Sequence, residues 1–203
     1  MPNSRAAIIQ AATHLFATRG YAKASLRDIA AACNLAPTLV YHHFDGKAGL
    51  LRSCMQRILE EIGQPIKTAV ADGKASDLHV AVADVGEACV SWSFRHPDEF
   101  RLLGRLVLFR DGISEVDFGA ELGAAIDKPF EPLIDRLVDD YGESARLAFV
   151  HARISLFGAI VAALGIGDLM IAPELRDAEI EQRAREGLAT AFTEGLFNML
   201  EPR

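Results

Sequence analysis

Apolar residues recur at intervals of three and four along the first twenty positions of the chain. The positions that share one side of a helix with 3.6 residues per turn are Ile8, Ile9, Ala12, Leu15 and Phe16. This spacing predicts an amphipathic helix over residues 4–18. Gly20 follows it, where the end of a helix favours glycine.

A shorter helix is predicted to begin directly after Ser25. Ser25 and Asp28 have the spacing of a capping box, in which the serine accepts from free backbone amides and the acid lies at the positive helix end. Its inward positions, over about two turns, are Leu26, Ile29, Ala30 and Cys33. Asn34 then tolerates the left-handed backbone of a tight turn, and Pro37 fits the first turn of another helix.

This second short helix continues through Val40, Tyr41 and Phe44 and is predicted to end at Gly46. Two short helices joined by a tight turn and braced by a longer preceding helix form a helix-turn-helix unit, which is typical of DNA-binding domains. Lys47 opens a long amphipathic helix, and Pro65 is expected to kink or interrupt it near Gly63.

The remaining chain reads as further helices without a convincing strand. One helix is predicted over residues 76–96 and another from residue 97. A capping box at Ser114 and Asp117 opens a further helix, which Pro129 and Pro132 must bend or divide. The last two helices are predicted over residues 144–164 and 174–199, with a loop over 165–173 between them. The fold class is therefore all-α with about nine helices. Residues 1–47 are expected to form a three-helix DNA-binding domain, and residues 48–203 a helical ligand-binding and dimerisation domain.

Composition narrows the class of protein. Of 203 residues 50% are hydrophobic, which is a globular and not a disordered profile. No run of about eighteen uncharged apolar residues and no signal peptide are found, so we expect a cytoplasmic protein without a membrane span. The three cysteines form no C-x-x-C pair and suit a reducing compartment.

Charge is divided unevenly along the chain. The net charge is −7, yet residues 1–57 carry seven basic and two acidic side chains, a net charge of +5 that leaves −12 for the remainder. Because residues 1–57 (the basic head) are positive and the rest of the chain is negative, we expect a polyanion to contact the head.

Three stretches of this head resemble the N-terminal DNA-binding domain of TetR-type transcriptional repressors. They are I-I-Q-A-A-x-x-L-F-A-x-x-G-Y from Ile8 to Tyr21, S-L-R-D-I-A from Ser25 to Ala30, and Y-H-H-F-D-G-K-x-x-L from Tyr41 to Leu50. The resemblance implies an all-helical, two-domain homodimer whose C-terminal domain usually binds a small effector. The chain departs from the family pattern at Asn34, where glycine is usual, at Ala36, often a small hydroxyl residue, and at Pro37, often a basic residue.

The first turns of the short helix from Pro37 supply the candidates for reading base edges. Pro37 and Leu39 can make only apolar contacts, such as with thymine methyl groups, while Thr38 offers a hydroxyl and a methyl group. No Arg or Asn is present here for bidentate readout of guanine or adenine. We therefore expect modest base specificity, supplemented by DNA shape.

The remaining DNA-binding candidates follow from the resemblance and contact phosphates. Tyr41 and His42 match a phosphate-contacting pair at the edge of the groove, and Lys47 matches a phosphate-binding amine. Ser25 and Arg27 match contacts from the start of the preceding helix. For His43, packing or capping is the alternative that we favour.

The C-terminal domain yields a weaker set of candidates. A ligand pocket between helices would be lined by bulky apolar groups and a few polar ones, and the candidate ligand-binding residues are Cys89, Trp92, Arg105, Phe109 and His151. Core packing, surface exposure or a dimer contact are the alternatives for the polar members. Cys33 matches a small buried position of the family, with redox sensing as the alternative.

Small residues recur every fourth position in the last two predicted helices, in the sets Ser155, Ala159, Ala163 and Gly187, Ala191, Gly195. With the resemblance, this indicates a four-helix homodimer interface. A two-fold dimer presents recognition helices about 34–36 Å apart, one DNA turn, to a pseudopalindromic operator.

The function predicted is that of a dimeric repressor which a small-molecule effector releases from double-stranded DNA. The alternative is a DNA-binding regulator without an effector, which acts constitutively or through a protein partner. An enzyme is not expected, because metalloprotease, P-loop, nucleophile-elbow and dinucleotide-binding motifs are all absent from the sequence. No cofactor and no metal site are predicted, since the adjacent His42 and His43 cannot face one ligand from a helix.

Overall fold

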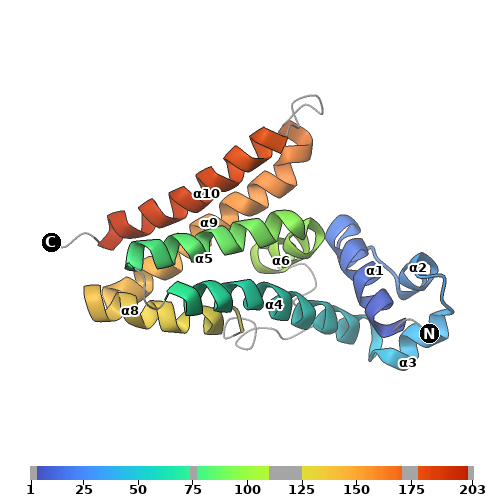
Figure 1. Cartoon of the computed structure of the whole chain (residues 1–203). Helices are drawn as coiled ribbons and strands as arrows, with labels where there is room; N and C mark the ends of the chain where they lie inside the picture. Colours follow the sequence, from blue (N-terminus) through green and yellow to red (C-terminus); the bar gives the residue numbers. More distant parts are fainter. Residues whose placement is uncertain (1–3, 74–76, 110–124, 171–177, 201–203) are drawn as a thin grey trace. The chain divides into compact units, whose positions relative to one another are not determined.

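The computed structural model describes residues 4–73, 77–109, 125–170 and 178–200. Within these ranges the chain forms nine α-helices and one short 3-10 helix and contains no strand (Figure 1). The predicted all-α class is thereby confirmed. The chain divides into two compact units, Met1–Glu60 with His96–Leu122 (unit 1) and Glu61–Arg95 with Gly123–Arg203 (unit 2).

Unit 1 is built on α1 (Ser4–Arg19), α2 (Leu26–Ala32), α3 (Pro37–His43), the first part of α4 (Gly46–Asp72) and α6 (Pro97–Phe109). Its helices meet over large side chains that are buried almost completely, among them Ile8, Phe16, Ile29, Val40, Leu50, Leu51, Met55, Leu102 and Leu106. The apolar stripe predicted for residues 4–18 thus forms the centre of this core.

The tight turn between α2 and α3 has the predicted geometry. Asn34 has φ +54° and is the only residue other than glycine with a positive φ in the described ranges. The amide of Leu35 donates to the carbonyl oxygen of Ala30 at 2.9 Å, which satisfies a carbonyl group at the end of α2. Pro37 is the first residue of α3, as expected.

The predicted domain boundary after residue 47 does not coincide with the division into compact units. α6, which the sequence analysis assigned to the C-terminal domain, packs against α1. Two polar contacts join the helices, from His14 Nδ1 to Asp98 Oδ2 and from Arg105 Nε to the carbonyl oxygen of Ala17, both at 2.7 Å. Sequence patterns within single helices carry no signal for such a pairing.

Unit 2 contains the rest of α4, α5 (Leu78–Arg95), the 3-10 helix η3 (Lys128–Phe130), α8 (Glu131–Tyr141), α9 (Ser144–Met170) and α10 (Ala178–Leu200). α10 packs on α5 and α9, and α8 packs on α9. Phe149 is fully buried, with its ring centroid 5.5 Å from that of Phe130 and 6.0 Å from that of Phe192. Gly86 permits α10 to approach α5, because a Cβ atom there would lie 2.8 Å from Phe192 Cδ1.

Neither Pro65 nor Gly165 interrupts its helix. α4 continues through Pro65 to Asp72, so of the kink or interruption expected there the interruption is absent, and α9 continues through Gly165 to Met170, where a loop over 165–173 was predicted. Within a helix a glycine costs about 1 kcal/mol and a proline about 3 kcal/mol relative to alanine, and the other backbone hydrogen bonds and the packing of these long helices offset that cost. The capping box predicted at Ser114 and Asp117 lies outside the described residues.

Candidate nucleic-acid interface

α3 has one buried side and one side open to solvent. Val40 is completely buried and Phe44, which follows the helix, is 6% exposed, so both fix α3 to unit 1. On the opposite side Tyr41 is 61% exposed, and Thr38 and His42 are exposed as well. The outward side of α3 therefore presents hydroxyl, imidazole and apolar groups.

The other two predicted base readers differ in exposure. Pro37 is exposed at the start of α3, and Leu39 is half-buried. Ala36, at the N-cap position, provides no side-chain cap, so the start of α3 depends on the fixed φ of Pro37. Between Pro37 and His43 no arginine, lysine, asparagine or glutamine is available for bidentate base contacts.

The start of α2 is closed by the predicted capping box. Ser25 Oγ accepts from the amide of Asp28 at 3.1 Å, and the amide of Ser25 donates to Asp28 Oδ2 at 3.1 Å. The Ser25 hydroxyl also donates to this carboxylate at 2.6 Å, and these bonds hold the pKa of Asp28 below its usual value. Ser25 is thus engaged within α2, whereas the side chain of Arg27 is exposed.

The N-terminal end of α1 lies against the C-terminal end of α3. Ser4 Oγ lies 2.9 Å from His43 Nε2 within hydrogen-bonding distance, and the Arg5 guanidinium is 5.4 Å from the centroid of the Phe44 ring. His43 therefore has a hydrogen-bonding partner on α1, and the packing or capping role that we favour for it stays a prediction. The contacts of Ser4 and Arg5 could not be predicted from the sequence, because nothing in the pattern of α1 indicates which helix end they meet.

Lys47, near the start of α4, is held by the turn between α1 and α2. Its Nζ donates to the carbonyl oxygen of Ala22 at 3.2 Å and lies 4.3 Å from the centroid of the Tyr21 ring. The amine predicted to bind phosphate thus has two intramolecular partners.

The sequence matches known regulators over this unit and beyond it. The family model described as "Bacterial regulatory proteins, tetR family" matches residues 8–54. The HTH-type transcriptional repressor Rv3405c of Mycobacterium tuberculosis is 30% identical over 207 residues, an alignment that covers 100% of this chain and 94% of that protein. The chain belongs to the TetR family of DNA-binding transcriptional regulators.

Solved structures of the TetR family share its fold. A TetR-family regulator from Bordetella parapertussis superposes with a TM-score of 0.68 at 20% identity, with 100% of both chains covered. The fatty acid degradation regulator FadR from Bacillus halodurans gives a TM-score of 0.66 at 16% identity and covers 100% of this chain and 99% of its own. At sequence identities of 20% and 16%, these two similarities show a shared fold and nothing about the ligand.

The five ligand-binding candidates of this TetR-family chain are divided between the two compact units. Arg105 and Phe109 belong to α6 in unit 1, where Arg105 binds α1 and the Phe109 side chain lies outside the described part of the structure. Cys89 and Trp92 belong to α5 in unit 2, while His151 is exposed on α9. Burial raises the pKa of the Cys89 thiol to about 12, so at neutral pH this side chain is an uncharged thiol.

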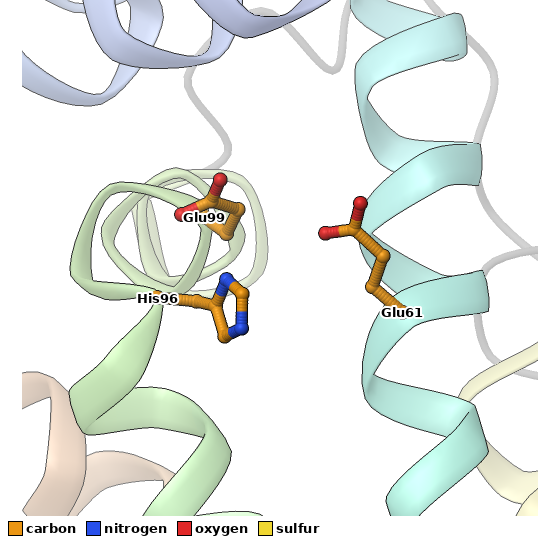
Figure 2. A group of neighbouring side chains, drawn as sticks. All are labelled: Glu61, His96 and Glu99. Carbon is orange, nitrogen blue, oxygen red and sulfur yellow. The ribbon is translucent and has the colours of Figure 1, made fainter.

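Acidic and imidazole groups stand at the start of α6. Figure 2 shows His96 and Glu99 there, together with Glu61 on α4. Glu61 belongs to unit 2, whereas His96 and Glu99 belong to unit 1. His96 and Glu99 place their ligand atoms within 4.8 Å of each other. Two ligands are fewer than the three or four protein ligands of zinc sites, so the pair in unit 1 is not a metal site by itself.

Proposed function

We propose that this TetR-family regulator is a homodimeric, cytoplasmic repressor that binds a pseudopalindromic operator through α3 and releases it when a small-molecule effector binds. What supports DNA binding most directly is the outward face of α3, where Tyr41, His42 and Thr38 are exposed within the segment 1–57, whose net charge is +5. An exposed tyrosine with 61% of its surface accessible contributes nothing to a core, whereas its hydroxyl and ring suit a phosphate at the edge of a groove.

A homodimer is supported by the exposed apolar side of α9, which carries Leu147 and Ile154. Within the segment Ser144–Leu164, a window of 18 residues has a mean hydropathy of 1.9, but only 28% of that window is buried in the monomer. By length and composition this segment could cross a membrane. However, Phe149, Leu156 and Ile160 pack one side of it within unit 2, which is typical of a helix in a bundle. On the other side Leu147 and Ile154 are 60% and 57% exposed, and a second copy would cover them.

The small residues of α9 and α10 are suited to the same contact. Cβ atoms built at Gly158, Gly187 and Gly195 meet no atom within 4 Å, so all three positions face open space in the monomer. Ala159 and Ala191 are exposed too. Small exposed side chains on two adjacent helices would let the helices of a partner subunit approach closely, as the four-residue spacing predicts. A two-fold interface of this kind would present two copies of α3 to the two half-sites.

Release by an effector requires a connection between the units. α4 is a continuous helix of 27 residues whose first part belongs to unit 1 and whose remainder belongs to unit 2. An effector with higher affinity for a conformation in which the two copies of α3 are wrongly spaced would shift the population away from DNA. The second candidate is a regulator that is controlled by a protein partner or acts constitutively. It differs from the effector-released repressor in one measurable property, because no small molecule would raise its melting temperature.

DNA binding is tested by selecting duplexes from a random library with the purified protein and titrating an enriched duplex by fluorescence anisotropy. The Arg27→Ala, Tyr41→Ala double variant is expected to lose at least about tenfold in affinity, and wild-type affinity is expected to fall steeply with salt. Lys67→Ala, which removes an exposed charge from unit 2, is the control and should bind as wild type. Unchanged binding by the double variant would refute the assignment of α2 and α3.

A further inference from the structure

Arg153 places a positive charge on the side of α9 that packs within unit 2. It follows the fully buried Phe149 by about one helical turn, and Leu156, which is 7% exposed, continues the same side. Only 20% of the Arg153 side chain is exposed, and its guanidinium carbon lies 5.6 Å from the centroid of the buried Phe130 ring. A cation in such surroundings costs free energy unless another group compensates its charge.

Asp127 is the one ion-pair partner of Arg153 among the described residues. Arg153 Nη1 donates a hydrogen bond to Asp127 Oδ1, and the other N–H groups of the guanidinium remain available. The Asp127 side chain is 48% exposed, so its carboxylate can return to water at a lower cost than the enclosed guanidinium can. The pair therefore combines a cation held by the core with an anion that can be exchanged.

The surroundings of Cys89 indicate an enclosed space beside this cation. Burial raises the pKa of the Cys89 thiol to about 12, as it does for Cys54, and the nearby Arg153 guanidinium opposes this shift without cancelling it. Cys54 has no accessible surface, whereas Cys89 is only half-buried. Accessible surface on a residue that is desolvated as strongly as Cys54 indicates a cavity at least as large as a water molecule.

We propose that Arg153 binds the carboxylate group of the effector in place of Asp127, and that the effector is a small monocarboxylate with an apolar body. The inference rests on the effector-released repressor proposed above and names the chemical class of its effector. A monoanion replaces Asp127 charge for charge, and a carboxylate matches two parallel N–H groups of a guanidinium. The ring of Phe130 and the side chain of Cys89 favour an apolar body over a polar one.

Melting temperatures measured with a panel of straight-chain, branched and aromatic monocarboxylates test the ligand class. Each carboxylate is compared with its primary amide, which has a similar shape and no charge. At least one carboxylate is expected to raise the melting temperature and to release the selected duplex, while its amide does neither. The dissociation constant of this carboxylate is then measured by isothermal titration calorimetry for the wild type and for each variant.

Substitutions of the ion pair should change the affinity in opposite directions. Arg153→Met should weaken carboxylate binding at least about tenfold and still fold, because Asp127 can turn to water. Asp127→Asn removes the competing anion and should strengthen binding several-fold, a gain that a purely structural ion pair would not produce. Arg146→Met is the matched control, because Arg146 lies on α9 beside Asp135 and Glu143 with 49% of its side chain exposed, and it should bind as wild type.

Cys89→Leu tests the enclosed space without changing a charge. If the cavity is present, the larger side chain fills it, so we expect an unchanged or higher melting temperature together with loss of carboxylate binding. Cys54→Leu provides the comparison, because Cys54 has no accessible surface. Overpacking there should lower the melting temperature by several degrees.

Three results would overturn the proposal. They are a panel in which no carboxylate raises the melting temperature, wild-type affinity in Arg153→Met, and a fall in melting temperature in Cys89→Leu as large as that in Cys54→Leu. Weaker binding by Asp127→Asn would overturn the exchange of anions. If neutral compounds alone release the duplex, the effector-released repressor stands and the carboxylate site is wrong, whereas if no compound of either kind releases it, the effector-released function fails as well.

Discussion

Arg105 Nε donates a hydrogen bond of 2.7 Å to the carbonyl oxygen of Ala17, and through it α6 caps the C-terminal end of α1. Carbonyl groups in the last turn of a helix have no partner within the helix, and a cation there also favours the helix dipole. Arg105 was predicted to bind an effector, and that role stays a prediction. The hydrogen bond shows that Arg105 also has a structural partner on α1.

Replacement of Arg105 should therefore affect stability. Arg105→Met keeps most of the aliphatic side chain but leaves the Ala17 carbonyl oxygen without this donor, so we expect the free energy of unfolding to fall by about 1–2 kcal/mol. Urea denaturation measures this change. Arg95→Met is a suitable control, because Arg95 is exposed and its Nε donates only to the Ser91 carbonyl oxygen within α5. Equal stability of Arg105→Met and wild type would contradict this capping role.

The dimer interface can be tested by introducing charge on the exposed apolar side of α9. Leu147→Glu and Ile154→Glu should each weaken dimerisation, and together they should yield a monomer, because carboxylates would be buried against the partner without counter-ions. Light scattering after size-exclusion chromatography gives the molar mass. Val80→Glu introduces the same charge at an exposed apolar position of α5 and should leave the dimer intact. A monomeric wild type would contradict the proposed assembly.

Elements with local signals could be predicted from the sequence. The capping box of Ser25, the left-handed turn at Asn34 and the first helical position of Pro37 depend on residues a few positions apart, and all three were confirmed. The amphipathic stripe of α1 likewise identified its core residues. These features depend on backbone propensities that tertiary contacts here reinforce.

Contacts between distant segments could not be predicted in this way. The contact of Lys47 with the Ala22 carbonyl oxygen and the contact of Arg105 with α1 both depend on how the helices pack. The periodicity of a single helix does not indicate such contacts. The exposure of His151 illustrates the same limit, since α9 is apolar on both sides and its sequence does not reveal which side unit 2 buries.

The capping box of α2 leads to a pH-dependent prediction. Ser25→Ala should lower the free energy of unfolding by about 1 kcal/mol at pH 7. The pKa of Asp28 is lower in the folded state than the usual 3.8, so the stability that its carboxylate contributes is present above this value and is lost as pH falls through the lower, folded-state pKa. Urea unfolding of both proteins should show the difference between them shrinking below pH 4. Asp45→Asn controls for loss of one carboxylate, and a difference independent of pH would contradict the linkage.

The three cysteines should differ in their reactivity towards iodoacetamide. Burial raises the pKa of both Cys54 and Cys89 to about 12, and the thiolate is the reactive form. Cys33 and Cys89 are both half-buried, and burial raises the pKa of Cys33 as well, but no large shift is found for it as for the other two. Mass spectrometry after brief treatment at pH 8 should find Cys33 modified first, and Cys54 and Cys89 modified only after urea is added. Early modification of Cys89 in the folded protein would contradict the raised pKa of its thiol.

The outward side of α3 predicts which groups of the operator are read. With no arginine or amide side chain between Pro37 and His43, the direct contacts left to Pro37 and Leu39 are apolar, and the thymine methyl group is the apolar feature of the major groove. Replacing a contacted thymine by deoxyuridine in the selected duplex should weaken binding about fourfold, since burial of one methyl group is worth about 0.8 kcal/mol. Anisotropy titrations measure this loss.

A variant of α3 makes the deoxyuridine experiment specific. Leu39→Ala removes apolar surface from α3, so the penalty for deoxyuridine at the thymine that Leu39 contacts should shrink, while the penalty at other thymines should persist. Thr38→Ser and Thr38→Val separate the methyl group of Thr38 from its hydroxyl in the same assay. Deoxyuridine placed between the half-sites is the control, because α3 does not reach those pairs in a two-fold complex. If every deoxyuridine duplex bound as tightly as the thymine duplex, readout by α3 would have to depend on His42, the hydroxyl of Thr38 and DNA shape alone.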